Sequence, residues 1–79
     1  MKETVVISRY FAVTISSQGK VVAKETFDAL MPAREFAHRT AKNYDKNHLT
    51  TYRIEIYYSD GDDCVFETGG YKNGKEFEY

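Results

Sequence analysis

The segment YYSDGDD, from Tyr57 to Asp63, contains a cluster of carboxylates that could bind a metal ion or act as catalytic acids. Asp60, Asp62 and Asp63 bring three carboxylates into four consecutive positions. A calcium loop of the EF-hand type needs acids at alternate positions, a distant glutamate and a preceding helix. The segment has neither the full spacing of such a loop nor a preceding helix, so we predict no metal site. Its composition favours a solvated hairpin turn whose charges discourage pairing of a sheet edge with other chains.

Nucleophilic catalysis by Cys64 is a second chemistry, and it needs a histidine base and a third group that orients the base. The chain has two histidines, His38 and His48. Cys64 precedes Val65 and Phe66 in a predicted strand, where we expect a buried, unreactive thiol. The sequence has no glycine-rich phosphate loop, metal-ligand spacing or serine elbow. We therefore expect no enzyme activity and no cofactor.

Glu55 and Glu67 are the candidates for a catalytic carboxylate pair. We expect them to face each other across two neighbouring strands. Glycoside chemistry requires a cleft that holds two carboxylates at a set distance, and a domain with one sheet and one helix rarely encloses such a cleft. We interpret both glutamates as surface charges.

The size and composition of the chain limit the classes of protein to which it can belong. The chain has 79 residues, which corresponds to a single domain, residues 1–79, with one core. Its lone cysteine excludes an internal disulfide, and it lacks a secretory leader, so we expect a cytoplasmic protein. No apolar run approaches the roughly 20 residues that cross a bilayer, which argues against a membrane role.

The net charge of −1 hides an uneven distribution along the chain. Residues 1–48 contain eight lysines or arginines and five acids, whereas the remaining residues contain three basic and seven acidic side chains. This asymmetry predicts two surfaces of opposite sign. The small total disfavours a globally basic nucleic-acid binder.

Hydrophobic periodicity predicts several strands and one helix. The predicted strands cover 4–15, 21–27, 50–59, 63–68 and 75–79, and Gly69-Gly70 is predicted to bend or bulge the fourth strand. Hairpin turns are expected at Ser16–Lys20, Asp60-Gly61 and Asn73-Gly74. The predicted helix covers 32–46, with small alanines and the larger Phe36 and Tyr44 on its buried side.

These elements predict an α+β fold of order ββαβββ, with a single antiparallel sheet of four to five strands and one helix packed on one face. The other face would remain open to solvent. Tyr10 and Tyr57 fall on the parity opposite the aliphatic residues, so we expect that face to carry tyrosines.

The open face and the acidic turn together predict a surface that binds a protein or nucleoprotein partner. Tyrosine contributes a large contact area, and carboxylates favour a basic partner. The predicted contact residues are Tyr10, Glu55, Tyr57, Asp60, Asp62 and Asp63. The protein could be a monomer or a homodimer, because an exposed sheet edge can pair two copies.

A basic stripe on the predicted helix supports an alternative function, direct binding of nucleic acid. Its members are Arg34, His38, Arg39, Lys42 and Lys46. Such a row could follow phosphates, with neighbouring tyrosines stacking on bases. Glu35 and Asp45 interrupt the row, and an ordinary solvated helix face has a similar composition.

The hairpin RYFAVTISSQGKVVAKETF, the helix PAREFAHRTAKNY and the meander YRIEIYYSDGDDCVFET together resemble small phage-encoded host-takeover proteins, including anti-CRISPR inhibitors. The resemblance rests on size, element order and surface type. The resemblance implies that the protein binds a host nucleoprotein complex stoichiometrically. In doing so it would block either the nucleic-acid channel of the complex or a surface that recruits other proteins. Strong DNA mimics look much more acidic, so contacts of mixed polar and aromatic character suit this chain better.

Overall fold

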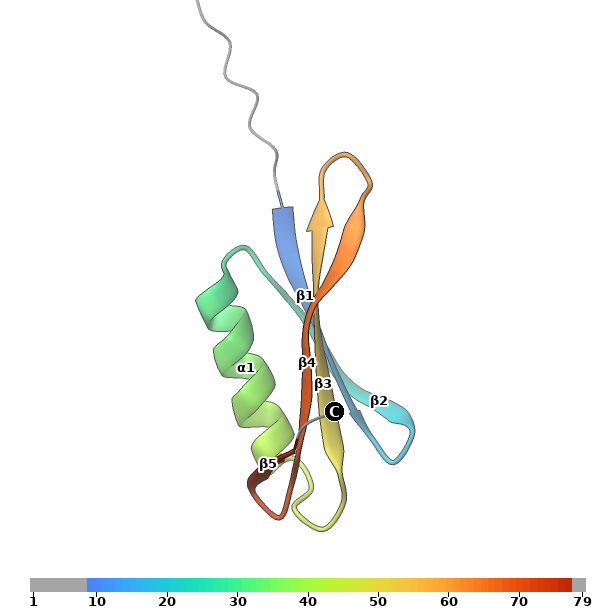
Figure 1. Ribbon diagram of the computed structural model, residues 1–79, viewed down its shortest axis with the longest axis vertical. Coiled ribbons are helices and arrows are strands. Elements are labelled where there is room, and N and C mark those ends of the chain that lie inside the picture. The colour runs from blue at the N-terminus through green and yellow to red at the C-terminus, as the bar shows by residue number, and fades with distance from the viewer. Residues whose placement is uncertain (1–8, 78–79) are drawn as a thin grey trace, which may run out of the picture.

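The computed structural model describes residues 9–77, which form five strands and one helix. The elements are β1 (Arg9–Ser17), β2 (Lys20–Phe27), α1 (Leu30–Asn43), β3 (Thr50–Tyr58), β4 (Asp63–Lys72) and β5 (Lys75–Phe77) (Figure 1). The order ββαβββ and the α+β class predicted from the sequence are confirmed. Residues 4–8 of the predicted first strand and 78–79 of the predicted last strand lie outside the described residues.

All five strands belong to one antiparallel sheet, in the spatial order β2-β1-β3-β4-β5. Residues with a positive φ angle occupy the predicted turns: Gln18 and Gly19 join β1 to β2, and Asn73 and Gly74 join β4 to β5. Asparagine and glycine tolerate this left-handed conformation best, which is why these dipeptides mark hairpins in the sequence. The hairpin expected at Asp60-Gly61 also forms, with Gly61 at a positive φ.

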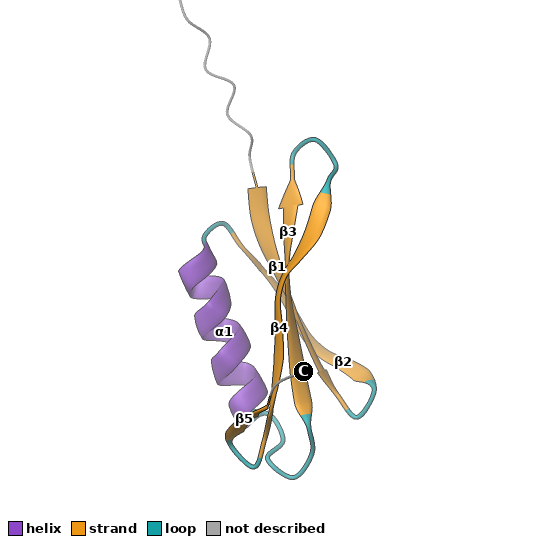
Figure 2. Ribbon diagram, viewed as in Figure 1, coloured by secondary structure: helices purple, strands orange, loops and turns teal. Residues whose placement is uncertain are grey.

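Helix α1 covers one face of the sheet, and no described element covers the other (Figure 2). Ala33, Ala37 and Ala41 are spaced by four, so they lie on one side of the helix, and all three are buried. Their small side chains let the helix lie close to the apolar side chains of the central strands. These side chains are Phe11, Val13, Ile15, Tyr52, Ile54 and Ile56.

The ends of α1 differ from the prediction. The helix begins at Leu30 and ends at Asn43, so it is shifted toward the N-terminus relative to 32–46. Phe36 is partly buried and packs against Phe27 at the border of the core, with ring centroids 5.5 Å apart. The prediction for Tyr44 is wrong: this residue is the C-cap, and it is 52% exposed because the helix ends before it.

A β-bulge in β4 decides which face its side chains occupy. Ile54 is paired with Glu67, whereas the next residue of β3, Glu55, is paired with Val65, so Phe66 is the extra residue. In a regular strand Val65 and Glu67 would lie on the same face. The bulge instead turns Glu67 to the face that α1 covers. The pairing continues without a shift through Gly69 and Gly70, so the bulge predicted at the glycines lies at Phe66.

Candidate partner-binding surface

Tyr10 and Tyr57 form a stacked pair on the open face of the sheet. They are directly opposite each other in β1 and β3, and their rings lie 5.1 Å apart at an angle of 10°. Each strand alternates its side chains between the two faces, so the neighbours Phe11 and Ile56 point into the core. Stacking of this kind restrains both rings and leaves their outer surfaces available for contact.

Glu55 adds a carboxylate beside this pair. The hydroxyl of Tyr57 donates a hydrogen bond to Glu55 Oε2 at 3.3 Å, and Arg53 Nε lies 3.7 Å from Glu55 Oε1. The charge of Glu55 raises the pKa of Tyr57 above its ordinary value, with slight burial and the hydrogen bond acting in the same direction. The Tyr57 hydroxyl therefore remains a hydrogen-bond donor throughout the neutral range.

The three aspartates lie in and beside the turn that joins β3 to β4, and all are exposed. Asp60 Oδ1 accepts a hydrogen bond from the backbone N–H of Asp62 at 3.1 Å, an arrangement that stabilises the turn. Asp63 is paired with Tyr57 and so shares the open face. We call Tyr10, Glu55, Tyr57 and Asp63 the tyrosine–acid surface. Over residues 9–77, no ion pair neutralises any of the three aspartates, and no group of three side chains could hold a metal ion.

The predicted basic stripe on α1 is divided by the structure. Arg34 and His38 point to the sheet, where both contact Glu67. Arg39 and Lys42 on α1 are exposed, and so is Lys46, which lies beyond the end of the helix and not on it as predicted. Two members of the predicted row, Arg34 and His38, therefore contact a carboxylate, and binding of phosphates by the row stays a prediction.

Glu67 is the centre of a polar cluster that the sequence analysis missed. Arg34 Nε donates a hydrogen bond to Glu67 Oε1 at 2.9 Å, and the Tyr52 hydroxyl donates one to Glu67 Oε2 at 2.9 Å. His38 Nε2 lies 3.1 Å from the same Oε2, and His38 Nδ1 lies 2.6 Å from the Tyr71 hydroxyl. This Glu67 cluster joins α1 to β3 and β4 at the border of the core.

The surroundings of the Glu67 cluster change the pKa values of its members. Burial alone would raise the pKa of Glu67, but hydrogen bonds from Tyr52, Arg34 and His38 outweigh it and lower that pKa. Burial and the hydrogen bond to Glu67 raise the pKa of Tyr52 far above its usual range. The carboxylate is therefore the charged partner in this cluster, and Tyr52 remains its neutral donor.

The spacing of Arg34 and His38 was the available sequence signal for this cluster, because residues four apart lie on one side of a helix. The sequence did not identify Glu67 as their acceptor, because only the bulge places Glu67 on the face that α1 covers. We expected Glu55 and Glu67 to face each other, and this is wrong, since Glu55 is paired with Val65 and Glu67 with Ile54 on the opposite face.

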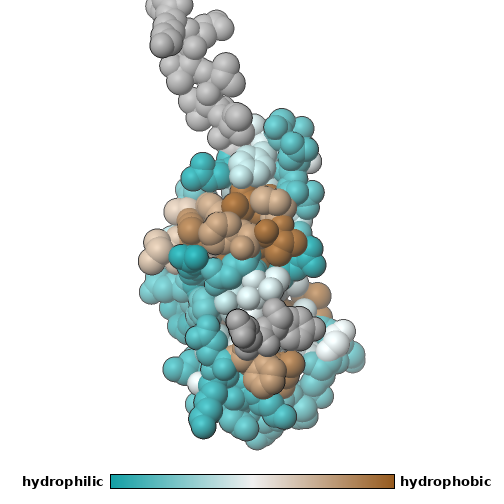
Figure 3. Space-filling model, in the orientation of Figure 1, coloured by the Kyte–Doolittle hydropathy of each residue, from teal (hydrophilic) through white to brown (hydrophobic). Residues whose placement is uncertain are grey.

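Cys64 is exposed, which contradicts the prediction of a buried thiol. The next two residues in β4 are also exposed, with Val65 at 48% and Phe66 at 42% exposure. Met31, at the start of α1, is 68% exposed. Figure 3 shows a hydrophobic band that crosses the molecule from the start of α1 to the middle of β4.

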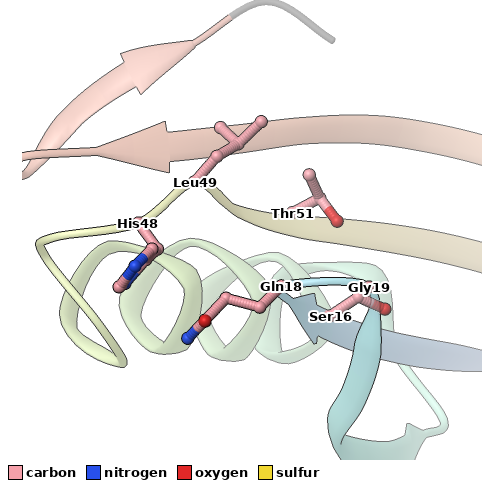
Figure 4. A pocket seen from close by; sticks show the side chains of 6 residues that line it. All are labelled: Ser16, Gln18, Gly19, His48, Leu49 and Thr51. Carbon is pink, nitrogen blue, oxygen red and sulfur yellow. The ribbon is translucent and has the colours of Figure 1, made fainter.

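A shallow hollow lies at the far end of the sheet, between the β1–β2 turn and the segment that enters β3 (Figure 4). Its lining residues are Ser16, Gln18, Gly19, His48, Leu49 and Thr51. The imidazole of His48 is held by Asp45, with Nδ1 2.9 Å from Oδ2. None of the predicted partner-binding residues lines this hollow, and its mixed polar lining indicates no particular ligand.

No helix within residues 9–77 is both long and apolar enough to span a bilayer. Comparison of the chain with known protein families, with curated proteins and with solved structures finds no match. The function of the chain is therefore inferred from its own surfaces.

Proposed function

We propose that this protein is a non-enzymatic module that binds a basic protein or nucleoprotein partner through the tyrosine–acid surface. The observation that carries the proposal is the stacked pair of Tyr10 and Tyr57 on a sheet face that no described element covers. Interface centres are enriched in tyrosine, which contributes a large area with few rotatable bonds to immobilise.

The charges around this pair support a basic partner. Glu55 and Asp63 lie beside the tyrosines, and Asp60 and Asp62 extend the negative charge to the tip of the turn. Opposite charge accelerates association and aligns the partners before close contact forms. A protein surface that ordinarily binds phosphate has the required positive charge. We therefore propose an inhibitor of a host nucleoprotein complex, of the kind that mobile elements encode, as the physiological role.

Affinity capture from a host lysate tests this function with three matched variants. Tyr10→Ala and Tyr57→Ala remove the centre of the surface, and we expect each to weaken capture of the specific partner by about tenfold or more. Tyr44→Ala is the control, because Tyr44 is also an exposed tyrosine but lies at the end of α1. Equal capture by all three variants would rule out the tyrosine–acid surface as the contact site.

A second function, nucleic-acid binding, is favoured by the exposure of Arg39, Lys42 and Lys46. Titration of the protein with generic DNA and RNA at low salt distinguishes the two functions. A non-enzymatic protein binder should show no binding in this assay. Micromolar binding that weakens steeply with salt, and that is lost when Arg39 and Lys42 are changed to alanine, would favour the nucleic-acid function.

A further inference from the structure

The sheet has two lateral edges: β2 forms one, and β4 and β5 share the other. β5 is paired only with Gly70–Lys72, through Phe77, Glu76 and Lys75. The preceding part of β4, 63–66, is paired with β3 on one side and has no strand on the other within residues 9–77. All four of these residues are exposed. We call 63–66 the free β4 edge.

The backbone direction along this edge follows from the turn. The N–H of Tyr58 donates to the carbonyl oxygen of Asp62 at 2.9 Å, so these opposite residues form a hydrogen-bonded pair. Hydrogen-bonded pairs alternate with non-bonded pairs along an antiparallel ladder. Cys64 therefore directs its backbone groups to β3, whereas Asp63 and Val65 direct their N–H and C=O groups away from the sheet. These outward groups can accept another strand.

Side chains on both faces of the sheet could support such a strand. Val65 is opposite Glu55, on the open face. Phe66 lies on the other side, where Arg34 Cζ is 5.5 Å from the centre of its ring. Met31, at the start of α1, is also exposed. Added strands gain affinity from main-chain hydrogen bonds and specificity from contacts of alternate side chains on each face.

Charge distinguishes this edge from the opposite one. Asp60, Asp62 and Asp63 stand at the end of the free β4 edge without an ion pair in the described part of the chain. The β2 edge instead carries Lys20 and Lys24 at exposed positions, and charged residues of this kind discourage strand addition. A second copy of the acidic β4 edge would be repelled, whereas a basic strand would be attracted.

We propose that a partner protein adds an extended segment of alternating apolar and basic side chains to the free β4 edge. This inference rests on the proposed function, because it names how the same partner docks. Because a strand alternates its side chains between the two faces, the apolar side chains of the segment would contact Phe66 on the face that α1 covers, and its basic side chains would contact Asp63 on the open face. The bulge at Phe66 changes the direction of the edge, so main-chain pairing is confined to 63–66.

A synthetic peptide of about eight residues that alternates lysine and valine is the probe, since this length matches a typical strand. A peptide that alternates glutamate and valine is its charge control. We expect the lysine peptide to slow hydrogen exchange of the Asp63 and Val65 amides, and the glutamate peptide to leave both unchanged. This measurement uses the unmodified protein and does not depend on whether a variant folds.

Two substitutions at one position separate backbone pairing from side-chain contact. Val65→Pro removes an outward N–H and leaves the ladder to β3 complete, a position where proline is tolerated in edge strands. Val65→Thr keeps the N–H and the branched shape. We expect Val65→Pro to weaken binding of the lysine peptide by about tenfold, and Val65→Thr to change it by less than about threefold.

Each outcome decides between the edge and the open face. Unchanged amide exchange, or equal binding by Val65→Pro and the unmodified protein, overturns strand addition. Loss of partner capture in Tyr57→Ala but not in Val65→Pro supports the proposed function and overturns the edge. Loss in Val65→Pro but not in the tyrosine variants supports the edge and overturns the tyrosine–acid surface. Concentration-dependent self-association that Val65→Pro abolishes would identify a second copy, through its β2 edge, as the occupant and overturn a separate partner.

Discussion

Arg34 and Glu67 form an ion pair, with Nε 2.9 Å from Oε1, that joins the first half of α1 to the bulged part of β4. Both side chains are partly exposed, so the attraction between their charges alone is weak. Hydrogen bonds from Tyr52 and His38 to the second oxygen make Glu67 the centre of a network instead. This network attaches the helix to the sheet in addition to the packing of the buried alanines of α1.

Replacing Glu67 with glutamine should lower the free energy of unfolding by about 1 to 3 kcal/mol, because several hydrogen bonds to a charged acceptor are weakened or lost. Chemical denaturation monitored by circular dichroism measures this change. Asp62→Asn is the control, since it removes one exposed carboxylate that no described ion pair involves, and it should alter stability by less than about 0.5 kcal/mol. Equal effects of the two substitutions would show that the Glu67 cluster does not stabilise the fold.

Stability should fall in acid, and Glu67 should account for part of the loss. The folded pKa of Glu67 lies below its usual value of 4.5, so its stabilisation is complete above that pH and disappears as the pH falls through the lower folded pKa. We expect Glu67→Gln to flatten this part of the pH profile. The hydrogen bond from His48 also lowers the pKa of Asp45, so Asp45→Asn is measured in parallel. An unchanged profile in Glu67→Gln would contradict the network.

Tyr52 should ionise later than an ordinary tyrosine as the pH rises. Burial and the hydrogen bond to Glu67 raise its pKa, so its contribution to stability is present below the usual value of 10.0 and is lost at higher pH. An alkaline titration followed by tyrosinate absorbance should show a late phase. Tyr52→Phe should remove that phase, and a titration identical to that of the unmodified protein would refute this assignment.

Gly69 should not tolerate a side chain. A Cβ atom at this position would lie 2.6 Å from the Tyr52 hydroxyl and 2.7 Å from Tyr52 Cε1. Gly69→Ala should therefore displace the Tyr52 ring and cost about 1 to 3 kcal/mol of stability. In a Tyr52→Leu background the same change should cost less, because the shorter side chain leaves room. A double-mutant cycle measures the difference, and additive costs would rule out this close contact as the cause.

Cys64 should react with an alkylating reagent in the native state. Its exposure predicts a rate within about tenfold of the rate in denaturant, because access limits a structural thiol more than its chemistry does. Mass spectrometry after timed quenching measures both rates. A native rate lower by several orders of magnitude would indicate that the thiol is covered in solution.

The sequence by itself determined the order of elements and the two faces of the central strands. Alternation in β1 and β3 separates Tyr10 and Tyr57 from Phe11 and Ile56, and dipeptides that accept a positive φ mark the turns. Both signals are local: the first depends on the period of a strand and the second on the backbone freedom of glycine and asparagine. For this reason the fold class and the open face could be predicted without coordinates.

Tertiary structure decided the face of Glu67, the exposure of Cys64 and the fate of the basic stripe. One extra residue at Phe66 reverses the alternation of β4, and no local pattern in DCVFET reveals it. The bulge depends on which partner each residue meets across the sheet, and a short β5 leaves Cys64 at an uncovered edge. Arg34 and His38 then contact Glu67, because its carboxylate offers both side chains an acceptor on the face that α1 covers. Pairings between residues far apart in the chain set these features, so only the folded molecule defines them.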